Sequence, residues 1–215
     1  KTLGRRVWDS RGRATVEAEI HLACGASGRA IAPAGASLGT REAIELRDAD
    51  GLGVNAAVAN VNGAIARALT GMDASRQEDI DTKLIALDGT PNKARLGANA
   101  TVAVSLAALH AAANAQGLPL FRHLAQGRPV RLPLPEIQIF GGGAHAGRRI
   151  DIQDLMVVAL AATSFGEALE MTARVYRAAG ELMRDAGKLR GVADEGGWWP
   201  EFASNEEAIE TLVRA

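Results

Sequence analysis

The chain has 215 residues, of which 47% are hydrophobic and 23% are charged. This composition excludes a disordered chain, and no apolar run approaches the roughly 20 residues that cross a bilayer. The 24 Lys and Arg residues balance the 25 Asp and Glu residues at a net charge of −1, so no field of one sign indicates a nucleic acid or a membrane as partner. The single cysteine, Cys24, and the polar start of the sequence predict a cytoplasmic protein without an internal disulfide or a signal peptide.

An alternating segment near the N-terminus predicts a half-buried strand. From Thr15 to Leu22, apolar and polar residues alternate without a break, which is the period of a strand with one face in the core. Gly25 then turns the chain into a second strand near residues 29–32. We therefore expect a small hairpin in this part of the chain.

Helical spacing follows the hairpin. Apolar residues recur at the spacing of one helix face over residues 52–69 and again over residues 80–87. Residues 98–115 are so rich in alanine that their helix must pack closely on its neighbours. Gly117 and Pro119 then form the expected helix stop.

The pattern changes after Pro129. An order of strand, helix, strand and helix follows, which is the repeat of a parallel α/β architecture. Two such units cannot close a barrel, so we expect residues beyond Ala215 to belong to the working protein. The two strands are an apolar stretch over residues 151–160 and a segment over residues 190–194. The first helix begins at the capping box of Ser164 and Glu167 and runs to about Ala186, and the second begins at the capping box of Ser204 and Glu207.

Two loops that contain glycine are candidates for contact with a ligand. The loop of residues 33–39 follows a predicted strand and has few side chains to pin it down, so it is either a lid or a surface turn. In residues 141–147, three consecutive glycines remove side chains from the surroundings of His145. This second loop is either a flexible turn or a ligand-contacting loop.

Polar residues in the second half of the chain occur at predicted strands. Gln153 and Asp154 interrupt an apolar strand, so one of them points either at a site or at a buried polar partner. Asp194 and Glu195 lie where the next predicted strand ends, which is where β/α barrels place catalytic groups. Adjacent carboxylates there bind a cation or displace each other's pKa, unless they belong to a solvated turn.

Eight short motifs occur along the chain. They are Asp9-Ser10-Arg11-Gly12, Gly35-Ala36-Ser37, Glu45-Leu46-Arg47-Asp48, LDGTPNK at residues 87–93, LGANA at residues 96–100, GGAHA at residues 142–146, Asp194-Glu195-Gly196-Gly197 and Ser204-Asn205-Glu206-Glu207. In this order and at nearly this spacing, the sequence resembles the enolase family from residue 5 to its last residue. The LDGTPNK and GANA strings are very specific to that family.

The resemblance implies a fold of two parts. Residues 1–127 would form an α+β capping domain of antiparallel strands and helices. Residues 128–215 would form the opening β/α units of an enolase-type TIM-like barrel, which this sequence leaves incomplete. Enolases pair through their N-terminal domains, and Arg5 and Glu17 match family positions that reach across that interface. The resemblance therefore also implies a homodimer or a higher homo-oligomer.

The activity that the resemblance implies is the glycolytic interconversion of 2-phosphoglycerate and phosphoenolpyruvate, with two Mg²⁺ ions. The substrate would be a small phosphorylated three-carbon acid. At the matching positions, Glu195 would be the acid that helps the hydroxyl leave, Asp154 its supporting carboxylate, and His145 a group that reaches the substrate. The substrate-binding residues would be Gly35, Ala36, Ser37, His145, Gln153 and Asp154, and Ser37 would also ligate the second Mg²⁺.

Other parts of the family's active site have no match in this sequence. The lysine base, the ligands of the first Mg²⁺ and the phosphate-binding Arg and Ser would lie beyond Ala215. To act as an acid near pH 7, Glu195 would need a raised pKa, which desolvation or the charges of Asp154 and Asp194 could supply.

Several matched positions depart from the usual residue of the family. Trp198 and Trp199, which are either a core anchor or the wall of a pocket, replace a smaller pair. The other departures are Ala34, Leu38, Gly141, Asp154 in place of Glu, and Ala193 in place of Gly. Such changes leave two alternatives to an ordinary enolase. One is a paralogue that makes carboxyphosphonoenolpyruvate for phosphonate natural products, and the other is a non-catalytic binding or structural protein.

Overall fold

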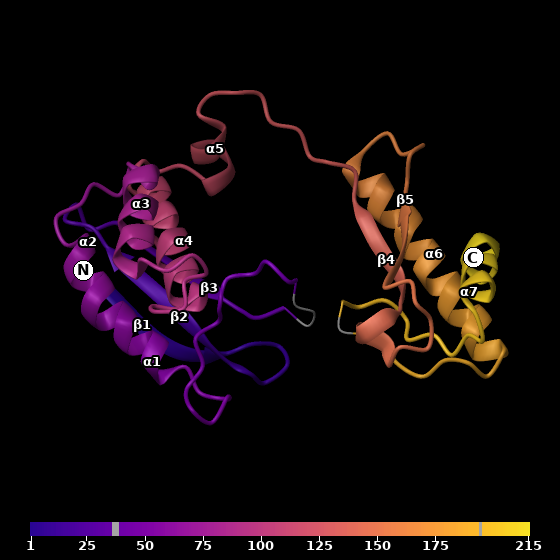
Figure 1. The fold of residues 1–215 in the computed structure, drawn as a ribbon. Coiled ribbons are helices and arrows are strands. Elements are labelled where there is room, and N and C mark those ends of the chain that lie inside the picture. Colours follow the sequence, from indigo (N-terminus) through magenta and orange to yellow (C-terminus); the bar gives the residue numbers. More distant parts are fainter. Residues whose placement is uncertain (36–38, 194) are drawn as a thin grey trace. The chain divides into compact units, whose positions relative to one another are not determined.

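The computed structural model of the chain describes residues 1–35, 39–193 and 195–215, which form two compact units, Lys1–Pro129 and Val130–Ala215 (Figure 1). The first unit holds a three-stranded antiparallel sheet in the order β1-β2-β3. Its strands are β1 (Thr2–Trp8), β2 (Ala14–His21) and β3 (Ser27–Ala32). Strands β2 and β3 confirm the predicted hairpin.

The first strand is one that the sequence does not predict. Residues 2–8 show no regular alternation, yet β1 pairs with β2 along its whole length. Arg5 lies opposite Glu17 in this register, and the two side chains form an ion pair with Nε 3.0 Å from Oε1. Arg5 and Glu17, which the resemblance places at a dimer interface, are thus paired with each other within one chain.

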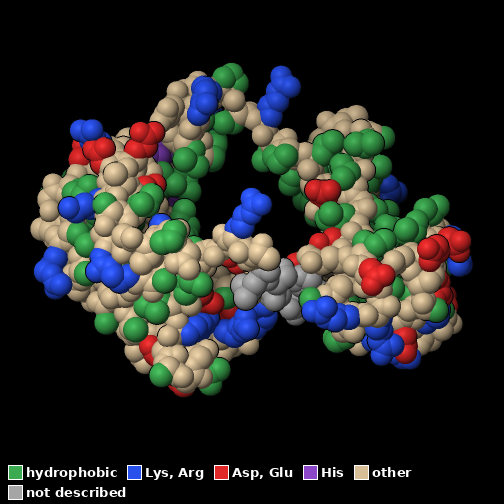
Figure 2. Space-filling view, in the orientation of Figure 1, with side chains coloured by type: hydrophobic (Ala, Val, Ile, Leu, Met, Phe, Trp, Pro, Cys, Tyr) green, Lys and Arg blue, Asp and Glu red, His purple; other side chains and the backbone are tan. Residues whose placement is uncertain are grey.

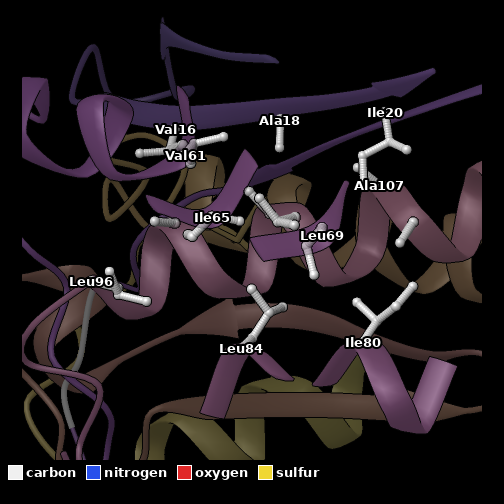
Figure 3. Close-up of a cluster of buried hydrophobic side chains, with 14 of the residues drawn as sticks. Val16, Ala18, Ile20, Val61, Ile65, Leu69, Ile80, Leu84, Leu96 and Ala107 are labelled. Carbon is white, nitrogen blue, oxygen red and sulfur yellow. The ribbon is translucent and has the colours of Figure 1, made fainter. Parts of the chain in front are cut away.

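Helices cover the sheet of the first unit, as the sequence predicts. They are α1 (Asn55–Asn60), a π-helical segment (Val61–Ile65), α2 (Ala66–Leu69), α3 (Gln77–Asp88), α4 (Ala98–Ala115) and α5 (Leu120–Ala125). The core lies between β2 and these helices, and its buried cluster contains Ile20 of the sheet together with helical side chains such as Ile65 and Leu84 (Figure 3). The short helix α5 is an addition to the predicted set.

The contact between α4 and β3 is unusually close. A Cβ atom on Gly28 would lie 2.1 Å from the backbone nitrogen of Ala111 and 2.3 Å from the carbonyl oxygen of Ala107. Ala107, Ala108 and Ala111 are fully buried. Only glycine on the strand and alanine on the helix permit this approach, which confirms the close packing predicted from the alanine content.

Asp88 organises the loop that contains the LDGTPNK string. Its carboxylate is almost fully buried and accepts hydrogen bonds from the backbone N–H groups of Thr90 (2.9 Å) and Leu96 (2.7 Å) and from the Thr90 hydroxyl. Burial by itself raises the pKa of Asp88. The hydrogen bonds to the charged form outweigh it and hold the pKa below its ordinary value.

Because the folded-state pKa of Asp88 is lowered, its contribution to stability is present above the unfolded-state pKa and is lost as the pH falls below about 4. We expect the stability difference between the wild-type chain and Asp88→Asn to narrow as the pH falls through this range. Urea unfolding of both proteins at several pH values measures it. A difference that stays constant below pH 4 would contradict the assignment.

The second unit has two strands and two helices. They are β4 (Glu136–Gly141), β5 (Asp154–Val158), α6 (Phe165–Asp185) and α7 (Asn205–Arg214), with a 3₁₀ turn at Gly143–Ala146. Both predicted helix starts are confirmed, because the hydroxyls of Ser164 and Ser204 accept from the N–H groups of Glu167 (3.1 Å) and Glu207 (3.3 Å). In turn, the carboxylate of each Glu accepts a hydrogen bond from the backbone N–H of the residue before the serine, Thr163 or Ala203.

The parallel β/α units predicted for the second unit are not confirmed in the described residues, in which Phe140 and Trp198 form an isolated parallel bridge. Strands β4 and β5 are antiparallel, and residues 142–153 between them hold one 3₁₀ turn, too little for the crossover that a parallel pair needs. Residues 190–193 form no strand of their own, and Val192 makes only an isolated bridge to Trp198. The backbone turns back at once there, with Gly196 at φ 95°.

Two surface properties complete the description of the fold. No helix in the described part of the chain is long and apolar enough to span a membrane. Lys and Arg side chains are mixed with Asp and Glu side chains over the visible face of each unit (Figure 2). This mixture agrees with the balanced charge of the sequence.

Candidate functional site

One amide joins the two carboxylates that the sequence marks as catalytic. The side-chain nitrogen of Gln138 donates to Oε2 of Glu195 at 2.8 Å and also to Oδ1 of Asp154. Asp154 accepts a further hydrogen bond on Oδ2 from the side chain of Gln153 at 3.0 Å. The structure therefore brings Gln153, Asp154 and Glu195 together around Gln138, which the sequence analysis does not single out.

The strand register explains how Gln138 reaches Asp154. Gln138 lies opposite Met156, and Asp154 is two residues from Met156 along β5, so all three belong to the same face of the sheet. A bulge after Gln138 lets the carbonyl of Ile139 accept from the N–H of Trp198 at 2.8 Å. This bond ties the segment that carries Glu195 to β4.

A tight turn holds Glu195. The N–H of Gly196 donates to the carbonyl of Ala193 (2.9 Å), and the N–H of Ala193 donates to the carbonyl of Gly197 (2.8 Å). Helix α6 adds a third anchor, because the Tyr176 hydroxyl donates to the carbonyl of Gly196 at 3.0 Å. Burial raises the pKa of Tyr176, so this hydroxyl keeps its proton at neutral pH.

Trp198 packs inside the second unit. Its ring stacks on Tyr176 with the centroids 4.6 Å apart, and its indole N–H donates to the Tyr176 carbonyl at 2.7 Å. A Cβ atom on Gly180 would lie 2.7 Å from the indole, so the tryptophan occupies space that a side chain at residue 180 would need. Of the two interpretations of Trp198, the structure supports the core anchor.

The loop that carries His145 is closed by backbone hydrogen bonds. The N–H of Gly142 donates to the Gln153 carbonyl (2.6 Å), that of Gly143 to the Ile150 carbonyl (3.0 Å), and that of Arg148 to the Gly143 carbonyl (2.7 Å). A Cβ atom on Gly142 would lie 2.0 Å from the Ile152 carbonyl oxygen, which explains the glycine. The side chain of His145 is not among the described parts of the structure.

The remaining predicted site residues belong to the first unit or lie outside the described ranges. Gly35 is the third residue after the end of β3. Ala36, Ser37 and Asp194 are outside the described residues, so the lid, the second Mg²⁺ ligand and one of the two adjacent carboxylates stay predictions.

Comparison with protein families identifies both halves of the chain. The model of the enolase N-terminal domain matches residues 1–124, and the model of the enolase C-terminal TIM barrel domain matches residues 129–215. The chain belongs to the enolase family. The antiparallel strands and helices of the first unit are those expected of the enolase N-terminal domain.

The joined carboxylates of this enolase-family chain face a cavity of about 660 Å³. The cavity lies in the second unit and is lined by Gln138, Asp154 and Glu195 together with apolar side chains such as Met156 and Leu169. Carboxylate and amide oxygens are hard ligands of the kind that Mg²⁺ prefers. In the described ranges, however, no three His, Cys, Asp or Glu side chains cluster as a metal site. The described residues therefore do not by themselves form the Mg²⁺ sites of the enolase family.

Two departures from the usual enolase residues contact each other. Gly141 ends β4, and a Cβ atom built on it would lie 2.4 Å from the Cβ of Ala193. There is room for a side chain at one of these positions but not at both. The pair Gly141 and Ala193 is therefore a matched change in packing.

We expect Gly141→Ala to destabilise the second unit by about 1–3 kcal/mol, because the new methyl group overlaps Ala193. The double variant Gly141→Ala/Ala193→Gly removes the overlap and should recover most of the loss. Urea unfolding of the wild-type chain, both single variants and the double variant gives the coupling between the two sites. Additive effects of the two substitutions would show that the residues do not share this space.

Proposed function

We propose that this protein catalyses the Mg²⁺-dependent interconversion of 2-phosphoglycerate and phosphoenolpyruvate by elimination of water. The observation that carries the proposal is the meeting of Asp154 and Glu195 at one amide, from segments far apart in the sequence. Membership of the enolase family supports the same reaction class.

The proposed chemistry assigns a separate task to each carboxyl group. Protonated Glu195 gives its proton to the C3 hydroxyl of 2-phosphoglycerate, which leaves as water, while the family's lysine base, expected beyond Ala215, removes the proton from C2 so that the double bond forms. The reverse reaction returns both protons. Asp154 accepts a hydrogen bond from the Gln138 amide, which also binds Glu195, and provides a negative charge nearby. Magnesium ions would supply charge stabilisation at the substrate carboxylate. Such a division of roles is typical of paired carboxyl groups in active sites.

The described geometry supports an unaltered reaction more than an altered one. Gly141 and Ala193 compensate for each other, and Trp198 fills space between α6 and the turn. Three of the departures are thus explained by packing. Asp154, which is shorter than the usual Glu, still contacts Gln138.

The test uses the full natural protein that contains residues 1–215. With Mg²⁺ present, addition of 2-phosphoglycerate should raise the ultraviolet absorbance as the double bond of phosphoenolpyruvate forms, and a chelator should stop the rise. Binding of phosphoenolpyruvate without hydration would favour the carboxyphosphonoenolpyruvate-forming paralogue. Absence of both binding and turnover would favour a non-catalytic protein. Either result would overturn the proposal.

The homodimer and the cytoplasmic location belong to the same proposal. The ion pair of Arg5 with Glu17 forms within one chain, and the side chain of Arg5 is still 45% exposed. A partner could therefore reach it. The molar mass from light scattering decides between monomer and dimer.

A further inference from the structure

We propose that Gln138 is a positioning residue that holds Asp154 and Glu195 as one catalytic pair. The inference rests on the proposed function for the roles of the two carboxylates, while the contacts of Gln138 stand on the structure alone. Its side-chain amide donates a hydrogen bond to each of them.

The amide of Gln138 is fixed at both of its polar atoms. Its oxygen accepts from the N–H of Gly197 at 2.8 Å, and its nitrogen donates to Asp154 and Glu195. The opposite orientation would place the amide oxygen against two carboxylates and the NH₂ group against an N–H. The network therefore permits one orientation of the amide.

Gly197 leaves the space in which the Gln138 amide packs. A Cβ atom on Gly197 would lie 2.4 Å from the Gln138 oxygen and 2.9 Å from its Cδ, so only glycine leaves room for the side chain. The second glycine after Glu195 thus has a defined task. It gives Gln138 both the space and the N–H group that hold its amide.

A carboxamide suits a position between two carboxylates. Each of its two N–H hydrogens can bind one carboxylate, which offsets the repulsion between them, and the amide itself neither gains nor loses a proton near neutral pH. The other titratable groups that line the cavity are Glu136 on β4 and Tyr176 on α6. The side chain of Gln138 is hydrogen-bonded instead to Asp154, Glu195 and Gly197. Loss of its amide is therefore expected to change the protonation of the pair.

The experiment compares three variants of the full natural chain. Gln138→Leu keeps a similar side-chain volume but removes the hydrogen-bond donor and acceptor. Gln138→Glu keeps the side-chain length but adds a negative charge when the pH exceeds the pKa of the new carboxyl group. Gln77→Leu is the matched control, because Gln77 also donates to a carboxylate, that of Asp81 at 3.1 Å, but in the first unit. The measurements are kcat against pH, phosphoenolpyruvate binding, thermal stability, and NMR titration of the carboxyl groups without substrate.

We expect Gln138→Leu to lower kcat by about 10- to 100-fold, the loss typical of a misplaced catalytic group, and to change the Kd for phosphoenolpyruvate by less than about threefold. Loss of the donated hydrogen bonds should raise the apparent pKa values of the pair. Gln138→Glu should recover activity only at low pH, where its carboxyl group is neutral. Gln77→Leu should leave the pH profile unchanged.

The outcomes separate this inference from the proposed reaction. If 2-phosphoglycerate is not turned over but the NMR titration still shifts in Gln138→Leu, the reaction is wrong and the positioning role holds. If the pH profile and the titration of Gln138→Leu match those of the wild-type protein, Gln138 does not position the pair. A loss of thermal stability in Gln138→Leu with no change in either titration would also overturn the inference.

Discussion

Replacing Gly28 by alanine is expected to destabilise the first unit by about 3 kcal/mol or more, at the upper end of the range for overpacked cores. The added Cβ would lie within 2.3 Å of two backbone atoms of α4, the Ala111 nitrogen and the Ala107 oxygen. No side-chain rotation can relieve a contact with backbone atoms, so the helix must move away from the sheet. The urea midpoint of the full natural chain, followed by circular dichroism, measures the effect.

The neighbouring residue provides the control for this prediction. The side chain of Arg29 is 65% exposed and forms one surface ion pair with Glu17. Arg29→Ala should therefore change the free energy of unfolding by no more than about 0.5 kcal/mol. If Gly28→Ala is as mild as Arg29→Ala, α4 is not packed against β3 as closely as described.

Glu195→Gln is expected to lower kcat by about 10²- to 10⁴-fold, which is the usual contribution of a general acid. Glutamine keeps the shape of the side chain but carries no acidic proton to give to the leaving hydroxyl. The Kd for phosphoenolpyruvate should change little, because the substitution removes a proton donor and leaves the packing of the turn intact. Rates of the hydration reaction and calorimetric binding in the presence of Mg²⁺ measure the two effects separately.

A second glutamate in the same unit serves as the comparison. Glu170 lies exposed on α6, so Glu170→Gln makes the same chemical change outside the carboxylate pair. It should leave both kcat and Kd unchanged. Turnover by Glu195→Gln at the wild-type rate would show that another group supplies the proton.

Local signals in the sequence predict the helices of this protein well. Residues 98–115 form α4 with the predicted bounds, and Ser164 caps α6 with its own hydroxyl. These features depend on contacts within one or two turns of the chain, which a reading of neighbouring residues can detect.

Strand pairing depends on distant residues and is predicted less well. β1 has no alternating pattern of its own and exists because β2 offers a pairing edge. Residues 190–193 are predicted as part of a strand, but the turn that carries Glu195 folds this segment back to Trp198. The local sequence does not indicate either pairing partner, β2 for β1 or Trp198 for residues 190–193.

The candidate site shows the same difference between features that local sequence predicts and features that depend on distant residues. Asp154 and Glu195 are candidates from the sequence because they match motif positions at predicted strands. Gln138 sits in the segment Glu136–Gly141, where one amide among apolar residues resembles any satisfied polar group. Its role becomes visible only through Glu195, which lies 57 residues away. The polar interruption of that strand is the signal that could have indicated it.

The loop between β4 and β5 is held by main-chain bonds from Gly142, Gly143 and Arg148. A substitution at an exposed position such as Ala144 leaves these bonds in place, whereas Gly142 has no room for a side chain and Arg149 forms an ion pair with Glu201. The length of the loop is constrained as well. One inserted residue that shifted the register of β5 would turn the side chain of Asp154 to the opposite face of the sheet, away from Gln138. In this loop, a substitution at an exposed position is therefore expected to disturb the carboxylate pair less than an insertion.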